Sequence, residues 1–144
     1  MNKISNKIFI DTSVIIRFLT RDDEKKYHSC VQLFTQIEVG RLRPYISNIV
    51  IIEVIFVLNR LYQFPKKAVL EAIDKLLKLR NMTVIEKTDS KRSLELFSQI
   101  NIKFQDCLIA TQLPINCTLV TYDQEFKKIK QISSLTPSEL IEKQ

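Results

Sequence analysis

The residues best suited to chemistry are acids that stand in apolar surroundings. Glu53 lies inside the run from Ile49 to Leu58, in which all the remaining residues are apolar. Asp106 lies in the shorter, mostly apolar stretch from Phe104 to Ala110. Because burial of an ionised carboxylate costs several kcal/mol even after the protein relaxes, each of these acids needs a cation, an arginine or a proton.

Two further acids follow short apolar runs that are typical of buried strands. Asp11 follows one such run and Asp123 follows another, and the carboxyl ends of parallel strands are where function gathers in α/β folds. Four carboxylates that converge without a cation would repel one another. Mg²⁺ and Mn²⁺ prefer carboxylate and water oxygens and leave coordination positions for phosphate. The four acids together therefore indicate a divalent-cation site that acts on phosphate.

Each acid taken alone has a simpler structural explanation. Glu53 could form an ion pair with Arg60 or Arg17. Asp106 is favoured in the first turn of a helix by the helix dipole. The two acids that follow strands could form a turn or cap the next helix. The functional interpretation therefore depends on all four acids meeting at one place.

The composition excludes several other kinds of site. Gly40 is the only glycine, whereas phosphate-binding loops need several. His28 is the only histidine, and Cys30, Cys107 and Cys117 form no CxxC pair, so we expect neither a zinc site nor a disulfide framework. Charged residues interrupt the longest apolar runs, which argues against a secretory signal or a membrane span. We expect a reduced, cytoplasmic chain.

Hydrophobic periodicity predicts strands that alternate with helices. Strands are expected at 7–11, 44–47, 82–86 and 117–121, with an edge strand at 132–135. Helices are expected at 23–39, 48–62, 65–80, 104–113 and 123–129. Two more are expected, one that Ser13 caps and one that Thr88 or Asp89 caps. In the helix after Asp89, Leu94, Phe97 and Ile100 are expected to face the core. The pattern favours a single α/β domain over 1–144 with a central, mostly parallel sheet of four to five strands.

The four segments that hold the acids resemble, in order, the acidic motifs of PIN-domain nucleases, and above all of VapC-type toxins of toxin–antitoxin pairs. These segments run from Ile8 to Leu19, from Ile46 to Glu53, from Phe104 to Ala110 and from Leu119 to Asp123. The likeness extends over nearly the whole chain. It implies a PIN-like three-layer α/β/α sandwich.

The resemblance also implies a ribonuclease that depends on Mg²⁺ or Mn²⁺. The family's catalytic, metal-binding acids match Asp11, Glu53, Asp106 and, for a more variable fourth acid, Asp123. Ser13 and Thr121 match small polar positions that orient the carboxylates or a water on the metal. Lys103 departs from the family pattern, which often has Asp or Asn at that position before the third acid. This departure leaves open whether one ion or two are bound.

The hypothesis for the reaction is metal-assisted hydrolysis of RNA phosphodiester bonds, with single-stranded loops as the expected targets. The resemblance implies products with 5′-phosphate and 3′-hydroxyl ends. A net charge of +6 suits a polyanionic partner. Arg17, one turn past Ser13, is a candidate for a phosphate contact, and a surface ion pair is its alternative role.

The resemblance further implies a homodimer and an antitoxin protein that inserts a segment into the acidic pocket. The run at 49–58 and the helix at 65–80 offer more apolar surface than one small core needs, which suits an interface.

Two other functions remain open. One is a non-catalytic module whose acids bind a structural cation or an antitoxin arginine, and Lys103 keeps this alternative open. The other is a phosphotransferase with Asp11 as its nucleophile, which is disfavoured because Ser13 stands where such enzymes carry a second acid.

Overall fold

The computed structural model describes residues 5–144 and contains a five-stranded sheet with the strand order β3-β2-β1-β4-β5. Its strands are β1 (Lys7–Ile10), β2 (Arg43–Ser47), β3 (Thr83–Ile85), β4 (Thr118–Val120) and β5 (Ser133–Leu135). Every pairing between neighbouring strands is parallel. The sequence-based expectation of a mostly parallel sheet of four to five strands is confirmed.

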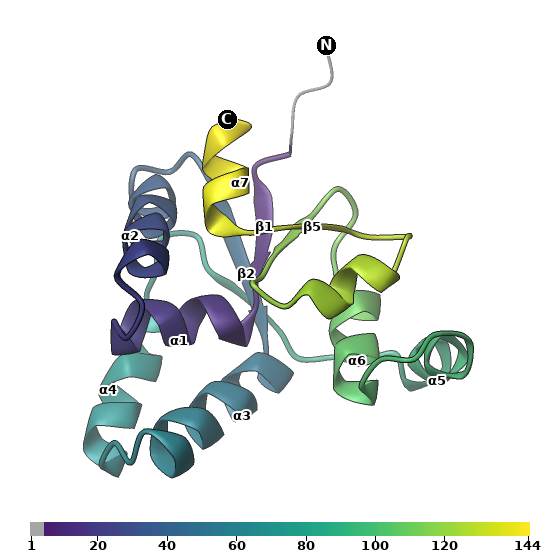
Figure 1. Ribbon diagram of the computed structural model, residues 1–144, viewed down its shortest axis with the longest axis horizontal. Helices are drawn as coiled ribbons and strands as arrows, with labels where there is room; N and C mark the ends of the chain where they lie inside the picture. The colour runs from purple at the N-terminus through teal and green to yellow at the C-terminus, as the bar shows by residue number, and fades with distance from the viewer. Residues whose placement is uncertain (1–4) are drawn as a thin grey trace.

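Helices cover both faces of the sheet. They are α1 (Thr12–Thr20), α2 (Glu24–Glu38), α3 (Asn48–Phe56), the π-helix η1 (Val57–Leu61), α4 (Lys66–Leu77), α5 (Ser90–Gln99), α6 (Phe104–Gln112), the 3₁₀ helix η2 (Gln124–Lys128) and α7 (Pro137–Glu142). Figure 1 shows α1 and α2 on one side of the sheet and α5 and α6 on the other, which is the expected three-layer α/β/α arrangement. Within residues 5–144, no helix is both long and apolar enough to cross a membrane.

The core lies around the central strand, because β1 is covered on both faces. Ile8, Phe9 and Ile10 are completely buried, and so are Leu119 and Val120 of the neighbouring β4. A strand buried on both faces reads as a continuous apolar run instead of an alternating one, which explains why these runs were recognisable in the sequence.

The order of the strands fixes where a ligand can bind. From β1 the chain moves outward through β2 and β3, and it then returns to the other side of β1 to form β4 and β5. The direction reverses between β1 and β4, and ligands of open parallel sheets bind outside the carboxyl ends of the strands at this kind of reversal. Asp11 follows the end of β1 and Thr121 follows the end of β4, so both lie at this point.

Several expected elements differ in detail from the structure. Ser13 does not cap α1, because Asp11 occupies the N-cap position and Ser13 bonds to its side chain instead. The helix expected at 48–62 changes from α to π at Val57, and the one expected at 123–129 is a 3₁₀ turn. Helix α7 was not expected from the sequence, and it begins with a capping box formed by Thr136 and Glu139.

The expected core stripe of α5 is wrong for two of its three residues. Leu94 is 57% exposed and Phe97 is 47% exposed. The buried residue of this helix is Ser93, whose hydroxyl lies 2.8 Å from that of Thr111 on α6. The inner face of α5 is therefore partly polar, and its apolar stripe points largely to solvent.

Candidate active site

All four acids identified from the sequence line one pocket of about 380 Å³. Each comes from a different part of the fold: Asp11 follows β1, Glu53 lies in α3, Asp106 lies in the first turn of α6, and Asp123 follows β4. The parallel sheet explains this convergence, because the carboxyl ends of its strands and the starts of the following helices meet at one edge.

Asp11 is the most firmly held of the four acids. Its Oδ2 accepts a hydrogen bond of 2.7 Å from the Thr121 hydroxyl and one of 2.9 Å from the Ser13 hydroxyl. The two hydroxyls are fixed in turn, because each also accepts a backbone N–H, from Asp123 to Thr121 and from Tyr122 to Ser13. Burial raises the pKa of the Asp11 carboxyl, and the hydroxyl donors oppose that rise. Ser13 and Thr121 therefore lie where they can orient this carboxylate.

Asp106 is buried without a partner for one of its oxygens. Asp106 is only 6% exposed, and its Oδ2 has no hydrogen-bond partner among residues 5–144. Burial, followed by the negative charge of Asp123, raises the pKa of Asp106 to about 6. Its place in the first turn of α6 matches the helix-dipole explanation. That explanation does not account for an oxygen left without a donor, because buried polar groups are normally satisfied.

Glu53 is half-buried, which corrects the expectation of an enclosed carboxylate. Its neighbours Ile52 and Phe56 are 65% and 57% exposed, so that side of α3 faces solvent. The side-chain amide of Gln105 donates a hydrogen bond to Glu53 Oε1. Burial, followed by the charge of Asp11, raises the pKa of Glu53.

The ion pairs suggested for Glu53 do not form. Among the residues that the structure describes, neither Arg17 nor Arg60 forms an ion pair with Glu53, and Arg17 bonds to Asp22 at 2.9 Å instead. The simpler explanation of Glu53 as a structural ion pair is therefore wrong.

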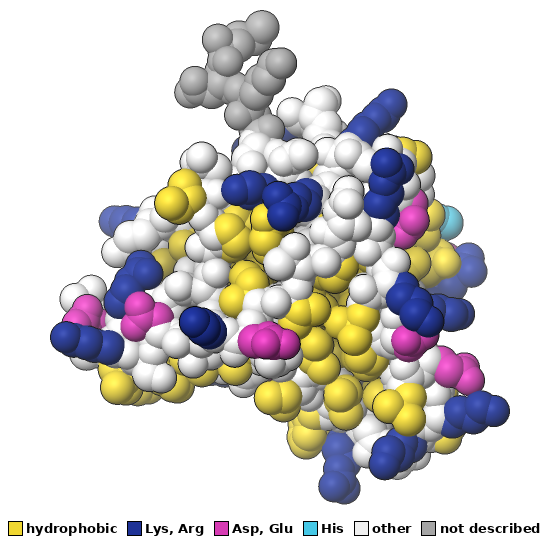
Figure 2. Space-filling model, turned by 180° about the vertical axis from the view of Figure 1, so that it is seen from behind, with side chains coloured by type: hydrophobic (Ala, Val, Ile, Leu, Met, Phe, Trp, Pro, Cys, Tyr) yellow, Lys and Arg dark blue, Asp and Glu magenta, His cyan; other side chains and the backbone are white. Residues whose placement is uncertain are grey.

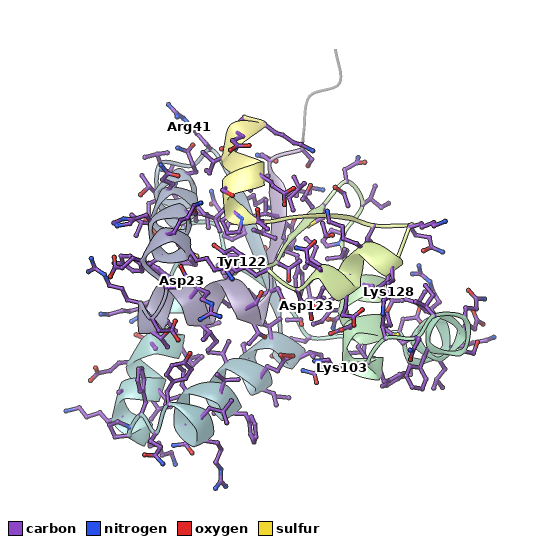
Figure 3. The ribbon with its side chains drawn as sticks, viewed as in Figure 1. Asp23, Arg41, Lys103, Tyr122, Asp123 and Lys128 are labelled. Atoms are coloured by element: carbon purple, nitrogen blue, oxygen red, sulfur yellow. The ribbon has the colours of Figure 1, made fainter. Side chains whose placement is uncertain are left out.

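Asp123 both caps a helix and lines the pocket. Its carboxylate accepts the backbone N–H of Glu125 at 3.0 Å, so the capping explanation holds for this residue. One of its oxygens takes part in that bond, and the side chain remains part of the pocket wall. Figure 3 shows Asp123 and Lys103 on the same side of the molecule, near α6.

Positive and aromatic side chains complete the pocket. Besides the acids, Arg17, Lys26, Lys103, Tyr62 and Tyr122 line it. Lys26 Nζ lies 4.8 Å from the centroid of the Tyr122 ring. The positive charge of Lys103 opposes the rise in the pKa values of Glu53 and Asp106 without cancelling it. Three of these residues were not expected from the sequence: Lys26, Tyr62 and Tyr122. Only Tyr122 carried a signal, because it lies between Thr121 and Asp123.

The residues present fit a hard divalent cation in their chemistry. The pocket supplies carboxylate oxygens, one of them buried without a donor, and such oxygens are the preferred ligands of Mg²⁺ and Mn²⁺. Among residues 5–144, no three Asp, Glu, His or Cys side chains are already grouped so as to hold a metal ion.

The chain is similar to known proteins over most of its length. The model of the PIN domain family matches residues 8–132. A VapC ribonuclease from Aquifex aeolicus is 25% identical over 123 residues, which cover 83% of this chain and 90% of that protein.

Solved structures share the fold at lower identity. VapBC-1 from nontypeable Haemophilus influenzae gives a TM-score of 0.68 at 18% identity, covering 91% of this chain and 98% of that one. VapC20 from Mycobacterium tuberculosis, described as a sarcin-ricin loop cleaving toxin, gives a TM-score of 0.62 at 18% identity, covering 84% and 93%.

Proposed function

The chain belongs to the PIN-domain family, and from this premise we propose that it is a metal-dependent endoribonuclease that acts as the toxin of a toxin–antitoxin pair. The observation that carries the proposal is that four acids from four separate parts of the fold line one pocket, one of them with a buried oxygen that lacks a donor within the described part of the chain. The similarity to a VapC ribonuclease supports RNA as the substrate.

In this proposal, Asp11, Glu53, Asp106 and Asp123 hold Mg²⁺ or Mn²⁺. When bound, such an ion activates a water for attack on phosphorus and stabilises the charge on the leaving oxygen. The hydroxyls of Thr121 and Ser13 keep one oxygen of Asp11 in a fixed place. Gln105 orients Glu53 through its amide group. Without a cation, Asp106 is partly protonated near its pKa of about 6, which reduces repulsion within the cluster.

The positive charge of the molecule suits an RNA substrate. The chain has 22 basic and 16 acidic residues, and four of the acids lie in the pocket. Basic side chains around such a pocket neutralise phosphates without reading the base sequence, so RNA binding should weaken steeply with salt. Single-stranded loops are the proposed targets, because their bases can be splayed outward.

The proposed partners are a second copy of the chain and an antitoxin protein. Ile52, Phe56 and Leu61 on α3 and η1 are each more than half exposed, as is Leu70 on α4. Figure 2 shows hydrophobic side chains gathered over the lower part of the rear face. Exposed apolar groups in such number are typical of an interface, and the VapBC-1 structure has the same fold.

The proposal is tested by RNA cleavage with Mg²⁺, with Mn²⁺ and with EDTA, followed by analysis of the product ends. We expect cleavage that needs the metal, leaves 5′-phosphate ends and is lost in Asp11→Asn. Asp74→Asn is the matched control, because it removes the same charge from α4, where Asp74 bonds to Lys78. Cleavage that survives both EDTA and Asp11→Asn would contradict the proposal. RNA binding without cleavage would favour the non-catalytic module.

A further inference from the structure

A single carboxylate beside the pocket holds two of the pocket's side chains. Asp22, in the loop between α1 and α2, accepts a hydrogen bond of 2.9 Å from Arg17 Nη1 on its Oδ1. Its Oδ2 accepts a hydrogen bond of 2.6 Å from the hydroxyl of Tyr62. Arg17 and Tyr62 both line the acidic pocket, and Asp22 itself does not.

Two uncommon backbone features bring these residues together. Arg21 ends α1 in the left-handed region, with φ of 52°, a conformation that few residues other than glycine adopt. This turn places Asp22 beside α1. Tyr62 directly follows the π-helix η1, and π-helices are rare and frequently occur at functional sites.

Stability of the fold does not explain this arrangement well. Asp22 is exposed, and exposed ion pairs contribute little to stability. The elements that it connects already pack together, since α1 contacts α3 and α3 continues into η1. The hydrogen bond from Tyr62 is the main cause that lowers the pKa of Asp22 to about 2, with Arg17 adding to it. Asp22 is therefore a carboxylate throughout the working pH range and keeps both partners in place.

Arg17 and Tyr62 present complementary chemistry to a nucleotide. A guanidinium has five N–H donors, and the bond to Asp22 uses one of them. The Tyr62 ring is half-buried and packs edge-on against Phe64, with ring centroids 6.2 Å apart. This contact and the hydroxyl bond to Asp22 restrain the ring. Aromatic rings of this kind bind unpaired bases by stacking, with little dependence on sequence.

We propose that Asp22 is a positioning residue that fixes Arg17 and Tyr62 as a nucleotide-binding wall of the pocket. Arg17 binds a phosphate of the RNA strand, and the Tyr62 ring stacks on a base next to the scissile phosphate. This inference rests on the proposed ribonuclease function, because it assigns the wall to the same RNA substrate.

The test measures binding and not cleavage, in the Asp11→Asn background with Mg²⁺ present. The probes are a fluorescein-labelled single-stranded RNA of 12 nucleotides and an abasic oligomer of the same length, followed by fluorescence anisotropy. Tyr62→Leu should weaken RNA binding about tenfold and leave the abasic oligomer unaffected, because only the RNA offers bases for stacking. Arg17→Ala should weaken binding of both probes, because both carry phosphates.

The positioning role of Asp22 is tested by whether the losses of RNA binding caused by separate substitutions add up when the substitutions are combined. In the same Asp11→Asn background, Asp22→Asn should weaken RNA binding several-fold while Arg17 and Tyr62 are present. It should have no further effect when Arg17→Ala and Tyr62→Leu are already present. Tyr62→Phe keeps the ring and its contact with Phe64, so it should give a smaller loss than Tyr62→Leu and guards against a folding defect. Asp74→Asn, which breaks an exposed pair of 2.8 Å on α4, should leave binding unchanged.

Two results would overturn the inference: RNA binding unchanged in Tyr62→Leu, or a further loss from Asp22→Asn when both partners are absent. Failure of the ribonuclease function gives a different result. In that case the wild-type chain would not cleave RNA with metal, while the pattern of binding losses would persist.

Discussion

The charge of Asp106 conflicts with its buried surroundings. Its folded-state pKa of about 6 lies above the ordinary value of 3.8, mainly because of burial. When the folded-state pKa of a carboxyl is raised, its protonation stabilises the folded chain over the unfolded chain. This contribution is fully present below about pH 4 and is lost as the pH rises through about 6.

We therefore expect Asp106→Asn to stabilise the metal-free protein at pH 8. The free energy of unfolding should rise by about 1 to 3 kcal/mol, because the variant removes a charge that burial penalises. Urea unfolding in EDTA at pH 8 and at pH 4 measures this effect, and the gain should disappear at pH 4. A variant that is less stable than the wild type at pH 8 would contradict this explanation of the site.

Thr121 offers a second prediction, because its hydroxyl holds Asp11 and accepts the N–H of Asp123. Thr121→Val keeps the shape of the side chain and removes both bonds. We expect RNA cleavage to fall about 10- to 100-fold, as for other residues that orient metal ligands, and stability to fall by about 1 to 3 kcal/mol. The measurement is the cleavage rate at saturating metal. Thr111→Val is the control, because Thr111 bonds to Ser93 away from the pocket.

The acids of the site could be predicted from the sequence, whereas part of their surroundings could not. An acid in an apolar run is conspicuous, as Glu53 and Asp106 show. Lys26 and Tyr62 come from ordinary amphipathic segments, and only the three-dimensional fold brings them to the pocket. The sequence suggested a surface ion pair as one role for Arg17, but it did not identify Asp22 as the partner.

At the scale of elements, strands were easier to predict than helix faces. The buried strands β1 and β4 are rich in apolar residues that do not alternate with polar ones, as at 8–10 and 119–120, because helices cover both faces of the sheet. The α5 stripe of Leu94 and Phe97 has helical spacing but faces largely outward. Periodicity identifies which residues share a face of a helix, and it does not say whether another element covers that face.

The end of α2 gives a prediction at this scale. Gly40 follows the helix with φ of 82°, in the left-handed region that glycine adopts without steric cost. A Cβ at Gly40 would lie 2.9 Å from Arg80 Cζ, and this guanidinium bonds to the carbonyl of Glu38. Gly40→Ala should lower the free energy of unfolding by about 1 to 2 kcal/mol. Urea unfolding measures this loss, and cleavage per folded molecule should not change.

The substitution Lys75→Ala, at an exposed position inside α4, is the control for this measurement. It should change stability by less than about 0.5 kcal/mol. A Gly40→Ala variant as stable as this control would show that the left-handed turn is not needed at this point.

At the scale of the whole molecule, the exposed apolar side chains predict self-association. Phe56 on α3 is 57% exposed, and Leu94 on the opposite flank is equally exposed. We expect Phe56→Asp to convert a homodimer into a monomer, because a buried charge without a partner is costly at an interface. Light scattering at several concentrations measures the mass. Leu94→Asp is the matched control and should remain dimeric, whereas a monomeric wild type at high concentration would contradict the proposal.

The central claim is that four acids from four elements form one cation site. Titration of the protein with Mn²⁺, with free Mn²⁺ followed by electron paramagnetic resonance, tests it without any RNA. We expect the wild type to remove Mn²⁺ from solution. Asp11→Asn, Glu53→Gln, Asp106→Asn and Asp123→Asn should each weaken that binding at least tenfold, while Asp74→Asn should bind as the wild type does. Equal Mn²⁺ binding by all of these proteins would contradict the claim.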